Sequence, residues 1–311
     1  MQLSVLSEPR ERHVPLVSRG GAMSVLDFGP RDRPVDIVFS HANGFNGRTY
    51  RSLLAPLADD LRILAVDMRG HGASTLPAVI EGREGWVQFR DDLLALLAAA
   101  TTRPVVLAGH SMGGTSSLLA AAAHPDQVKA LALFDPVFFE GARAGLDVAP
   151  NPLADSADRR RAVFATKTAA IAAYTGRGAF RSWSSEQLAD YVEAGFRDTG
   201  DGQVTLTCTP AWEASNFRTH NYDVWRRFAK PGARSVCCGP SSPRPRGSTI
   251  IWTSLPQCRA SRSKPSREPR TSCPWSGLIG FAPCCARLPR SKGRGLSQRR
   301  PLRGSLRRRT G

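Results

Sequence analysis

Residues 109–113 form a short motif whose residue types and spacing could do nucleophilic chemistry. Gly109-His110-Ser111-Met112-Gly113 fits the pattern G-x-S-x-G, directly after the apolar run PVVLAG and directly before the Ala-rich run TSSLLAAAAH. In a strand-to-helix turn this tight, small residues must flank the serine, whose backbone is strained. The following helix directs its N-terminal N–H groups at developing negative charge. The motif therefore predicts a nucleophile elbow, with Ser111 as the nucleophile.

The elements that must position this elbow are indicated by alternating strand and helix patterns over the first 135 residues. Strands are expected at 23–29, 35–40, 61–67, 104–109 and 128–135. Helices are expected at 49–59, 86–100 and 115–124. Such alternation predicts an α/β fold with a mostly parallel sheet and helices on both faces. Beyond residue 135 the pattern becomes helical and irregular, with helices expected at 162–174 and 184–196.

The motif and its setting resemble the α/β-hydrolase family over about residues 14–232. The stretch SHANGFNG at 40–47 is similar to the oxyanion loop of that family, which normally carries His-Gly after the third strand. The resemblance places His41 and Ala42 at His-Gly. It also places Asn43 where its backbone N–H joins that of Met112 to bind an oxyanion.

This resemblance implies a domain layout and a reaction class. It divides the chain into an α/β-hydrolase core at 1–135, a helical lid at 136–227 and a return to the core at 228–232. The implied reaction is attack of a serine on an ester, thioester, amide or C–C substrate of small size, without a cofactor. In VDMRGHGAS at 66–74, Asp67 and Arg69 are expected to organise a loop.

The catalytic histidine of the family, expected after the last strand, has no counterpart in this sequence. The last of the six histidines is His220, which precedes the expected last strands and is only a weak candidate for a surrogate base. His110 should point away from the serine hydroxyl. Asp135, after the sixth strand, is either the triad acid or a helix cap or loop anchor. Without its base, this chain is expected to hydrolyse esters feebly or not at all.

The composition changes abruptly near residue 233. The net charge of +17 comes entirely from residues 233–311, which hold 18 Lys and Arg against one acidic residue, Glu268. The codons for Arg270–Leu278 can be read in a shifted frame that begins at the third base of each codon. In that frame they can encode His-Leu-Leu-Pro-Leu-Glu-Arg-Pro, which is similar to the family's terminal histidine segment. Codons for Gly232–Gly239 can likewise encode a seventh strand. These observations favour an out-of-frame, disordered segment from about residue 233, so that the last two strands and the final helix are absent.

Two functions stay open on these grounds. The first is a serine hydrolase, impaired here, that binds a small-molecule substrate and no nucleic acid, metal or membrane. The alternative is an inactive hydrolase-fold protein whose basic segment binds nucleic acid or other acidic partners. The segment MQLSVLSEPRERH is not apolar and no run approaches about 20 apolar residues, which predicts a cytoplasmic location. The tail cysteines lack C-x-x-C pairs, which speaks against zinc. The sequence does not indicate an oligomeric state.

Overall fold

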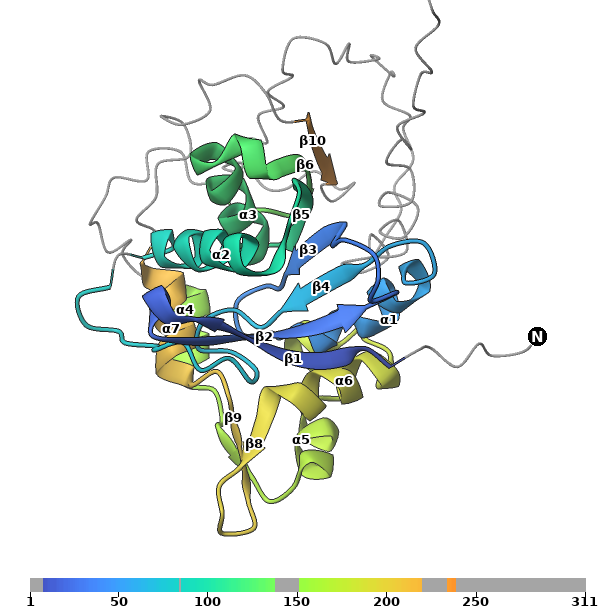
Figure 1. Cartoon of the computed structure of the whole chain (residues 1–311). Coiled ribbons are helices and arrows are strands. Elements are labelled where there is room, and N and C mark those ends of the chain that lie inside the picture. Colours follow the sequence, from blue (N-terminus) through green and yellow to red (C-terminus); the bar gives the residue numbers. More distant parts are fainter. Residues whose placement is uncertain (1–7, 84, 138–150, 220–233, 239–311) are drawn as a thin grey trace, which may run out of the picture.

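The main layer of the fold is a seven-stranded sheet in the order β1-β2-β4-β3-β5-β6-β10 (Figure 1). The computed structural model describes residues 8–83, 85–137, 151–219 and 234–238. The strands are β1 (Arg10–Leu16), β2 (Gly21–Phe28), β3 (Ile37–Ser40), β4 (Ile63–Val66), β5 (Val105–His110), β6 (Val128–Phe134) and β10 (Arg234–Cys238). β1, β2 and β4 pair antiparallel, and the remaining pairs are parallel. The predicted mostly parallel sheet is confirmed.

Two apolar cores lie on the two faces of this sheet because successive strand residues point to opposite sides. In β3, Val38 belongs to one core, whereas its neighbours Ile37 and Phe39 belong to the other. The Val38 core packs against α2 (Val87–Ala100) and α3 (Met112–Ala123). The other core packs against the short helix α1 (Arg51–Leu54).

The helix expected at 49–59 is divided into three short pieces. A 3-10 turn at Arg48–Tyr50 precedes α1, and a second at Ala55–Leu57 follows it. Pro56 lies in the second turn. Proline has no N–H to donate to the preceding turn, so the regular α-helical ladder cannot continue through this position.

The segment described at 151–219 contains both helices and a small sheet. Its elements are α4 (Pro152–Asp158), β7 (Val163–Phe164), α5 (Lys167–Tyr174), α6 (Ser185–Gly195), β8 (Phe196–Asp198), β9 (Val204–Leu206) and α7 (Pro210–Arg218). The three strands pair antiparallel in the order β7-β9-β8, which the sequence does not predict. The helix expected over 162–174 begins only at Lys167, because Thr166 caps its N-terminus through a 3.0 Å bond from the Ala169 N–H.

The sheet does not end at β6, as the sequence predicts. β10 pairs with β6 in parallel, from Arg234 opposite Ala130 to Cys238 opposite Phe134. An edge strand offers a row of unpaired backbone N–H and C=O groups, and another segment can satisfy them through its own backbone. The expectation that both last strands are absent is therefore wrong for one of them. The expected disorder of the rest of 239–311 concerns residues outside the described ranges.

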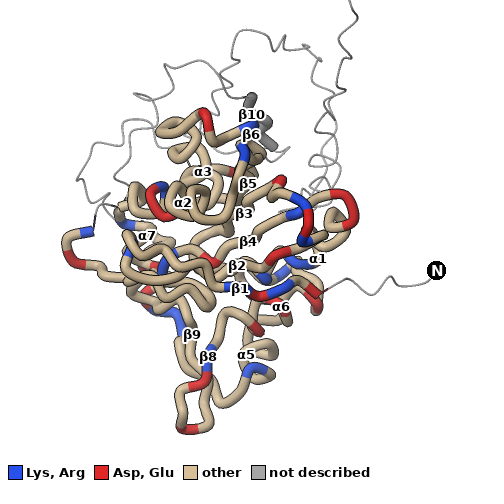
Figure 2. Tube along the Cα trace, in the orientation of Figure 1, with Lys and Arg blue, Asp and Glu red and all other residues tan. Residues whose placement is uncertain are grey.

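The charged residues and the helix lengths bear on membrane contact. Within the described ranges, no helix has the length and the hydropathy that a bilayer crossing requires. Figure 2 shows basic and acidic residues interspersed along the described chain, in agreement with the balanced charge of residues 1–232.

Candidate active site

Ser111 stands at the junction between β5 and α3 with a backbone conformation that L-residues rarely adopt. Its φ is 52° and its ψ is −117°. The Ser111 N–H donates to the Phe134 carbonyl at 2.9 Å, which ties the turn to the end of β6. A non-glycine residue at positive φ stores strain of about 1–3 kcal/mol, and such residues cluster at functional sites. The strained strand-to-helix turn that the motif predicts is present.

The glycines of the motif allow backbone segments to approach closely. A Cβ atom on Gly113 would lie 2.2 Å from the Ser40 carbonyl oxygen, and one on Gly109 would lie 2.5 Å from the Gly113 carbonyl carbon. Neither contact is possible for a larger residue without movement of the backbone. Glycine at these positions therefore lets α3 pack directly against β5 and against the loop that follows β3.

That loop, Ser40–Gly44, lies beside the elbow. Ser40 is directly opposite Gly109 in the parallel pairing of β3 with β5. The Asn43 side chain is turned towards α7, where it donates to the Glu213 carbonyl at 2.9 Å and accepts from Asn216 Nδ2 at 2.9 Å. Among the described hydrogen bonds, none uses the Asn43 backbone N–H.

The N-terminus of α3 is also left uncapped. The Ser111 side chain makes no capping hydrogen bond to this helix. The first N–H groups of a helix have no partner within the helix itself. Among the described hydrogen bonds, none uses the N–H group of Met112 or of Asn43. Their convergence on one point stays a prediction.

Two buried histidines hold the Ser40–Gly44 loop in place. His41 Nε2 accepts from the Met68 N–H at 2.9 Å and its Nδ1 lies 2.7 Å from the Ala42 carbonyl. His71 Nε2 accepts from the Gly44 N–H at 3.1 Å. Burial lowers the pKa of His41 to about 4 and the pKa of His71 well below its ordinary value. Both rings are therefore neutral at pH 7, and each acts as a fixed acceptor for backbone.

His110, inside the elbow, is held by Tyr50 rather than by Ser111. The Tyr50 hydroxyl lies 2.7 Å from His110 Nδ1 and accepts from the Ala42 N–H at 3.2 Å. Burial lowers the pKa of His110 to about 4, against a smaller opposing effect of the Asp135 carboxylate. His110 thus lies with Tyr50, and the described hydrogen bonds include none between the Ser111 hydroxyl and any histidine.

Asp135 directly follows β6 and also has a positive φ, 46°. The segment behind it is fixed by Thr115, whose hydroxyl donates to the Val137 carbonyl and accepts from the Val137 N–H, both at 2.9 Å. Asp135 is thereby placed at the carboxyl end of the strand next to β5, the same sheet edge as Ser111. His220, the weak candidate for a base, lies outside the described residues.

Asp67 and Arg69 organise loops, as the sequence predicts. Asp67 accepts from the N–H groups of Gly47 at 2.8 Å and Ala73 at 3.0 Å. Arg69 binds the buried carboxylate of Asp92 through Nε at 2.8 Å and Nη2 at 2.7 Å. Neither residue contacts the elbow, so both act through the backbone they support.

The structure also brings together side chains that sequence reasoning missed. The Phe45 ring lies 5.1 Å from the Trp183 ring and 5.8 Å from the Tyr191 ring, and 6.4 Å from His110. Arg160 pairs with Glu213 at 2.7 Å and bonds the Tyr191 hydroxyl. These residues come from five separate segments of the chain, so no local spacing signals the cluster. Phe45 thus links the aromatic core of residues 151–219 to His110 of the elbow.

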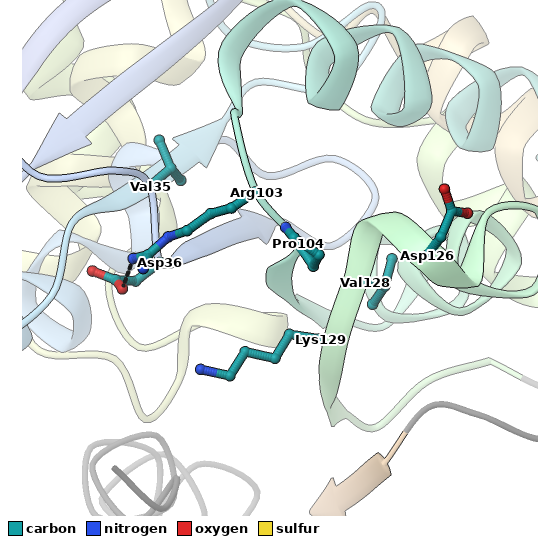
Figure 3. A pocket seen from close by; sticks show the side chains of 7 residues that line it. All are labelled: Val35, Asp36, Arg103, Pro104, Asp126, Val128 and Lys129. Atoms are coloured by element: carbon teal, nitrogen blue, oxygen red, sulfur yellow. Dashed lines mark hydrogen bonds and ion pairs between the residues drawn. The ribbon is translucent and has the colours of Figure 1, made fainter. Parts of the chain in front are cut away.

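A separate surface hollow of about 410 Å³ lies at the other edge of the sheet (Figure 3). Its lining includes Asp36, Arg103 and Lys129, which lie at or before the amino ends of β3, β5 and β6. Arg103 and Asp36 pair at 2.7 Å across it. Because Ser111 follows the carboxyl end of β5, this hollow is not part of the elbow site. Among the described residues, no group of three His, Cys, Asp or Glu could hold a metal ion.

The strand order, the strained elbow and the adjoining loop define the class of the protein. The family model described as "Alpha/beta hydrolase family" matches residues 37–269, and the chain belongs to this family. The matched range extends beyond residue 233, to residue 269. A change of reading frame near residue 233 stays a prediction.

Similar proteins include a hydrolase and a lipase from two organisms. A 2-(acetamidomethylene)succinate hydrolase from Mesorhizobium japonicum is 33% identical over 99 residues, 32% of this chain and 34% of that protein. Lipase LipV from Mycobacterium tuberculosis is 36% identical over 124 residues, 39% of this chain and 44% of that protein. The chain thus matches less than half the length of these relatives.

Solved structures share the fold. The crystal structure of an E-2-(acetamidomethylene)succinate hydrolase superposes with a TM-score of 0.59 at 22% identity, over 74% of this chain and 80% of that one. An α/β hydrolase from Novosphingobium aromaticivorans superposes with a TM-score of 0.54 at 22% identity, over 75% and 91% of the two chains. At this identity the likeness shows the fold alone.

Proposed function

We propose that this chain is a serine hydrolase in which Ser111 attacks the carbonyl carbon of a small-molecule substrate. The observation that carries the proposal is the positive φ of Ser111 at the junction of β5 and α3, between glycines that admit no Cβ. A backbone strained in this way is retained where the surrounding structure and the function demand it. The substrate is an ester, thioester, amide or C–C compound, since these are the bonds that a serine nucleophile of this fold cleaves.

In the proposed reaction, the Ser111 oxygen bonds to the carbonyl carbon, its hydroxyl proton passes to solvent water in the absence of a histidine base, and the carbonyl oxygen becomes an oxyanion. The N–H groups of Met112 and Asn43 donate to that oxyanion, and the positive end of α3 adds to its stabilisation. Collapse of the tetrahedral intermediate expels the leaving group and forms an acyl-enzyme, which water then hydrolyses. Asp135 is the proposed triad acid.

The general base is the missing part of this proposal. Residues 221–311 contain no histidine. We propose that the frame change near residue 233 replaces the segment that carried it, and that the chain is consequently impaired. An oxyanion hole with bound substrate leaves about 10³–10⁴-fold acceleration over water when a triad member is lost. The cytoplasmic location stays a prediction from the sequence.

The test compares this chain with a frame-restored variant. In the gene of that variant, the codons after codon 232 are read in the frame that begins at the third base of each present codon. Hydrolysis of p-nitrophenyl acetate should rise by about 10³-fold or more on restoration, and Ser111→Ala in the restored chain should abolish the gain. Ser18→Ala is the matched control, because Ser18 is exposed on the 3-10 turn before β2. Equal rates for the restored chain and its Ser111→Ala variant contradict the nucleophile assignment.

A second candidate function rests on the charge of residues 233–311, with 18 basic residues against one acidic residue. In that case the chain binds nucleic acid and hydrolyses nothing. Binding would weaken steeply between 50 and 200 mM salt, as phosphate contacts require. Slower migration of DNA in a gel-shift assay at low salt would favour this function. Ester hydrolysis should then be unchanged by Ser111→Ala, both in this chain and in the frame-restored chain.

A further inference from the structure

Arg83 is a half-buried arginine whose guanidinium lacks an acidic partner among the described residues. Its Nη1 donates to the Ser215 hydroxyl of α7 at 2.6 Å. The guanidinium carbon lies 4.3 Å from the centroid of the Trp212 ring, which holds the guanidinium over the aromatic face. Nε and Nη2 are both buried and have no hydrogen-bond acceptor in the described part of the chain.

The same two atoms bind carboxylates elsewhere in this structure. Arg69 grips Asp92 through Nε and Nη2 at 2.8 and 2.7 Å, and Arg62 grips Asp27 through Nε and Nη2 at 3.1 and 2.8 Å. Nε–H and Nη2–H form one edge of the guanidinium fork, and that edge matches the two oxygens of a carboxylate. In Arg83 this edge is buried and has no acceptor among the described residues.

The pKa of Arg83 is shifted in the opposite direction from that of Arg51, an arginine with an acidic partner. Burial, together with repulsion from Arg69, lowers the pKa of Arg83 to about 10. Arg51, which pairs with Asp190 at 2.9 Å, has its pKa raised instead. A buried cation without a counter-ion is costly, and an incoming anion recovers part of that cost.

Arg83 is connected to the candidate oxyanion loop through α7. Asn216 follows Ser215, the hydrogen-bond partner of Arg83, and donates through Nδ2 to Asn43 Oδ1 at 2.9 Å. Asn216 is fully buried, and its Oδ1 has no donor in the described part of the chain. The guanidinium of Arg83 is therefore held against α7, the helix that carries the unsatisfied acceptor, and Asn216 is hydrogen-bonded to Asn43.

We propose that Arg83 forms a subsite that binds a carboxylate carried by the substrate, with Asn216 accepting from a donor on the same molecule. This inference rests on the proposed function, because the subsite serves the substrate attacked by Ser111. It narrows the substrate class to acidic carbonyl compounds, such as half-esters or amides of dicarboxylic acids. Stacking on Trp212 fixes the plane of the guanidinium, and the hydrogen bond to Ser215 fixes its orientation within that plane.

The test measures binding without turnover, in the full chain carrying Ser111→Ala. The probes are the monomethyl esters of succinate, glutarate and adipate, each compared with its neutral dimethyl ester by isothermal titration calorimetry. At least one monoester should bind about 10-fold to 100-fold more tightly than its dimethyl counterpart, as hydrogen bonds to a charged group provide. Arg83→Gln should remove that preference and leave dimethyl ester binding unchanged.

Two further variants keep the result interpretable. Arg83→Lys retains the charge but loses the planar fork, and should keep only part of the preference even if Arg83→Gln does not fold. Arg103→Gln is the matched control, since Arg103 is a half-exposed arginine at the opposite edge of the sheet. The proposal is overturned if no monoester binds more tightly than its dimethyl ester, or if the preference survives in Arg83→Gln. Loss of the gained hydrolysis on Ser111→Ala in the frame-restored chain tests the nucleophile separately.

Discussion

The replacement Gly113→Ala introduces two opposing effects on stability in the elbow, a gain in helix propensity and a steric clash. Gly113 lies in the first turn of α3, where alanine is the better helix former by about 1 kcal/mol. However, the new Cβ would lie 2.2 Å from the Ser40 carbonyl oxygen and 2.6 Å from the His41 carbonyl oxygen. Ordinary contacts of this kind are longer than 3.4 Å. The backbone of α3 or of the Ser40–Gly44 loop must therefore move by about 1 Å, since neither atom belongs to a flexible side chain.

We expect the steric effect to be larger. Overpacking costs about 1–3 kcal/mol, and we expect the upper end of this range because only backbone atoms stand in the way. After the propensity gain of about 1 kcal/mol, the net loss in the free energy of unfolding should be about 2 kcal/mol, with a Tm lower by about 4–8 °C. Urea denaturation followed by circular dichroism measures this loss. Ala122→Gly reports the propensity effect in the same helix and should cost about 1 kcal/mol. A Gly113→Ala chain that is as stable as the parent, or more stable, refutes the close approach of α3 to β3.

Further predictions concern buried charge. The pKa of His41 is about 4 in the folded chain and about 6.5 in the unfolded one, so the unfolded chain binds the extra proton first as pH falls. Stability should therefore fall between pH 6.5 and 4, by about 3 kcal/mol from this residue, and a flat urea midpoint over that range contradicts the assignment. Asp92→Ala leaves Arg69 buried and unpaired and should cost about 3–5 kcal/mol in urea unfolding, while a loss below 1 kcal/mol refutes a buried pair. Asp190→Asn removes the carboxylate charge that pairs with Arg51, and α6 should then exchange its amide hydrogens faster than in the parent while exchange in α2 is unchanged; equal exchange of α6 in the parent and the variant shows that the pair does not anchor α6.

Local sequence patterns were sufficient for much of the core. The alternation of apolar runs places β3, β5 and β6 correctly to within two residues at their ends, because each run must cover a buried face of the sheet. The elbow was also predictable, because G-x-S-x-G between a strand and a helix has few other uses. These features depend on residues that are close together in the sequence, so local patterns indicate them.

Other elements depend on partners that are distant in the sequence. β7 and β9 are two and three residues long, and they form because each pairs with the other across forty residues of chain. β10 is a strand because β6 offers it an unpaired edge, although the segment around it has no strand periodicity. Short strands of this kind gain their hydrogen bonds only after the rest of the fold exists, so their own residues carry little signal.

The sequence by itself determined the family, the elbow at Ser111 and the loop at Asn43, because each depends on residue types at fixed short spacing. Only the tertiary structure decided that His41, His71 and His110 are neutral supports, since their pKa values follow from burial. It alone also decided that Arg83 stacks on Trp212 and that one edge of its guanidinium has no acceptor among the described residues. Arg83 and Trp212 are 129 positions apart, and contacts over that distance arise from the packing of α7 against the core, which no local pattern encodes.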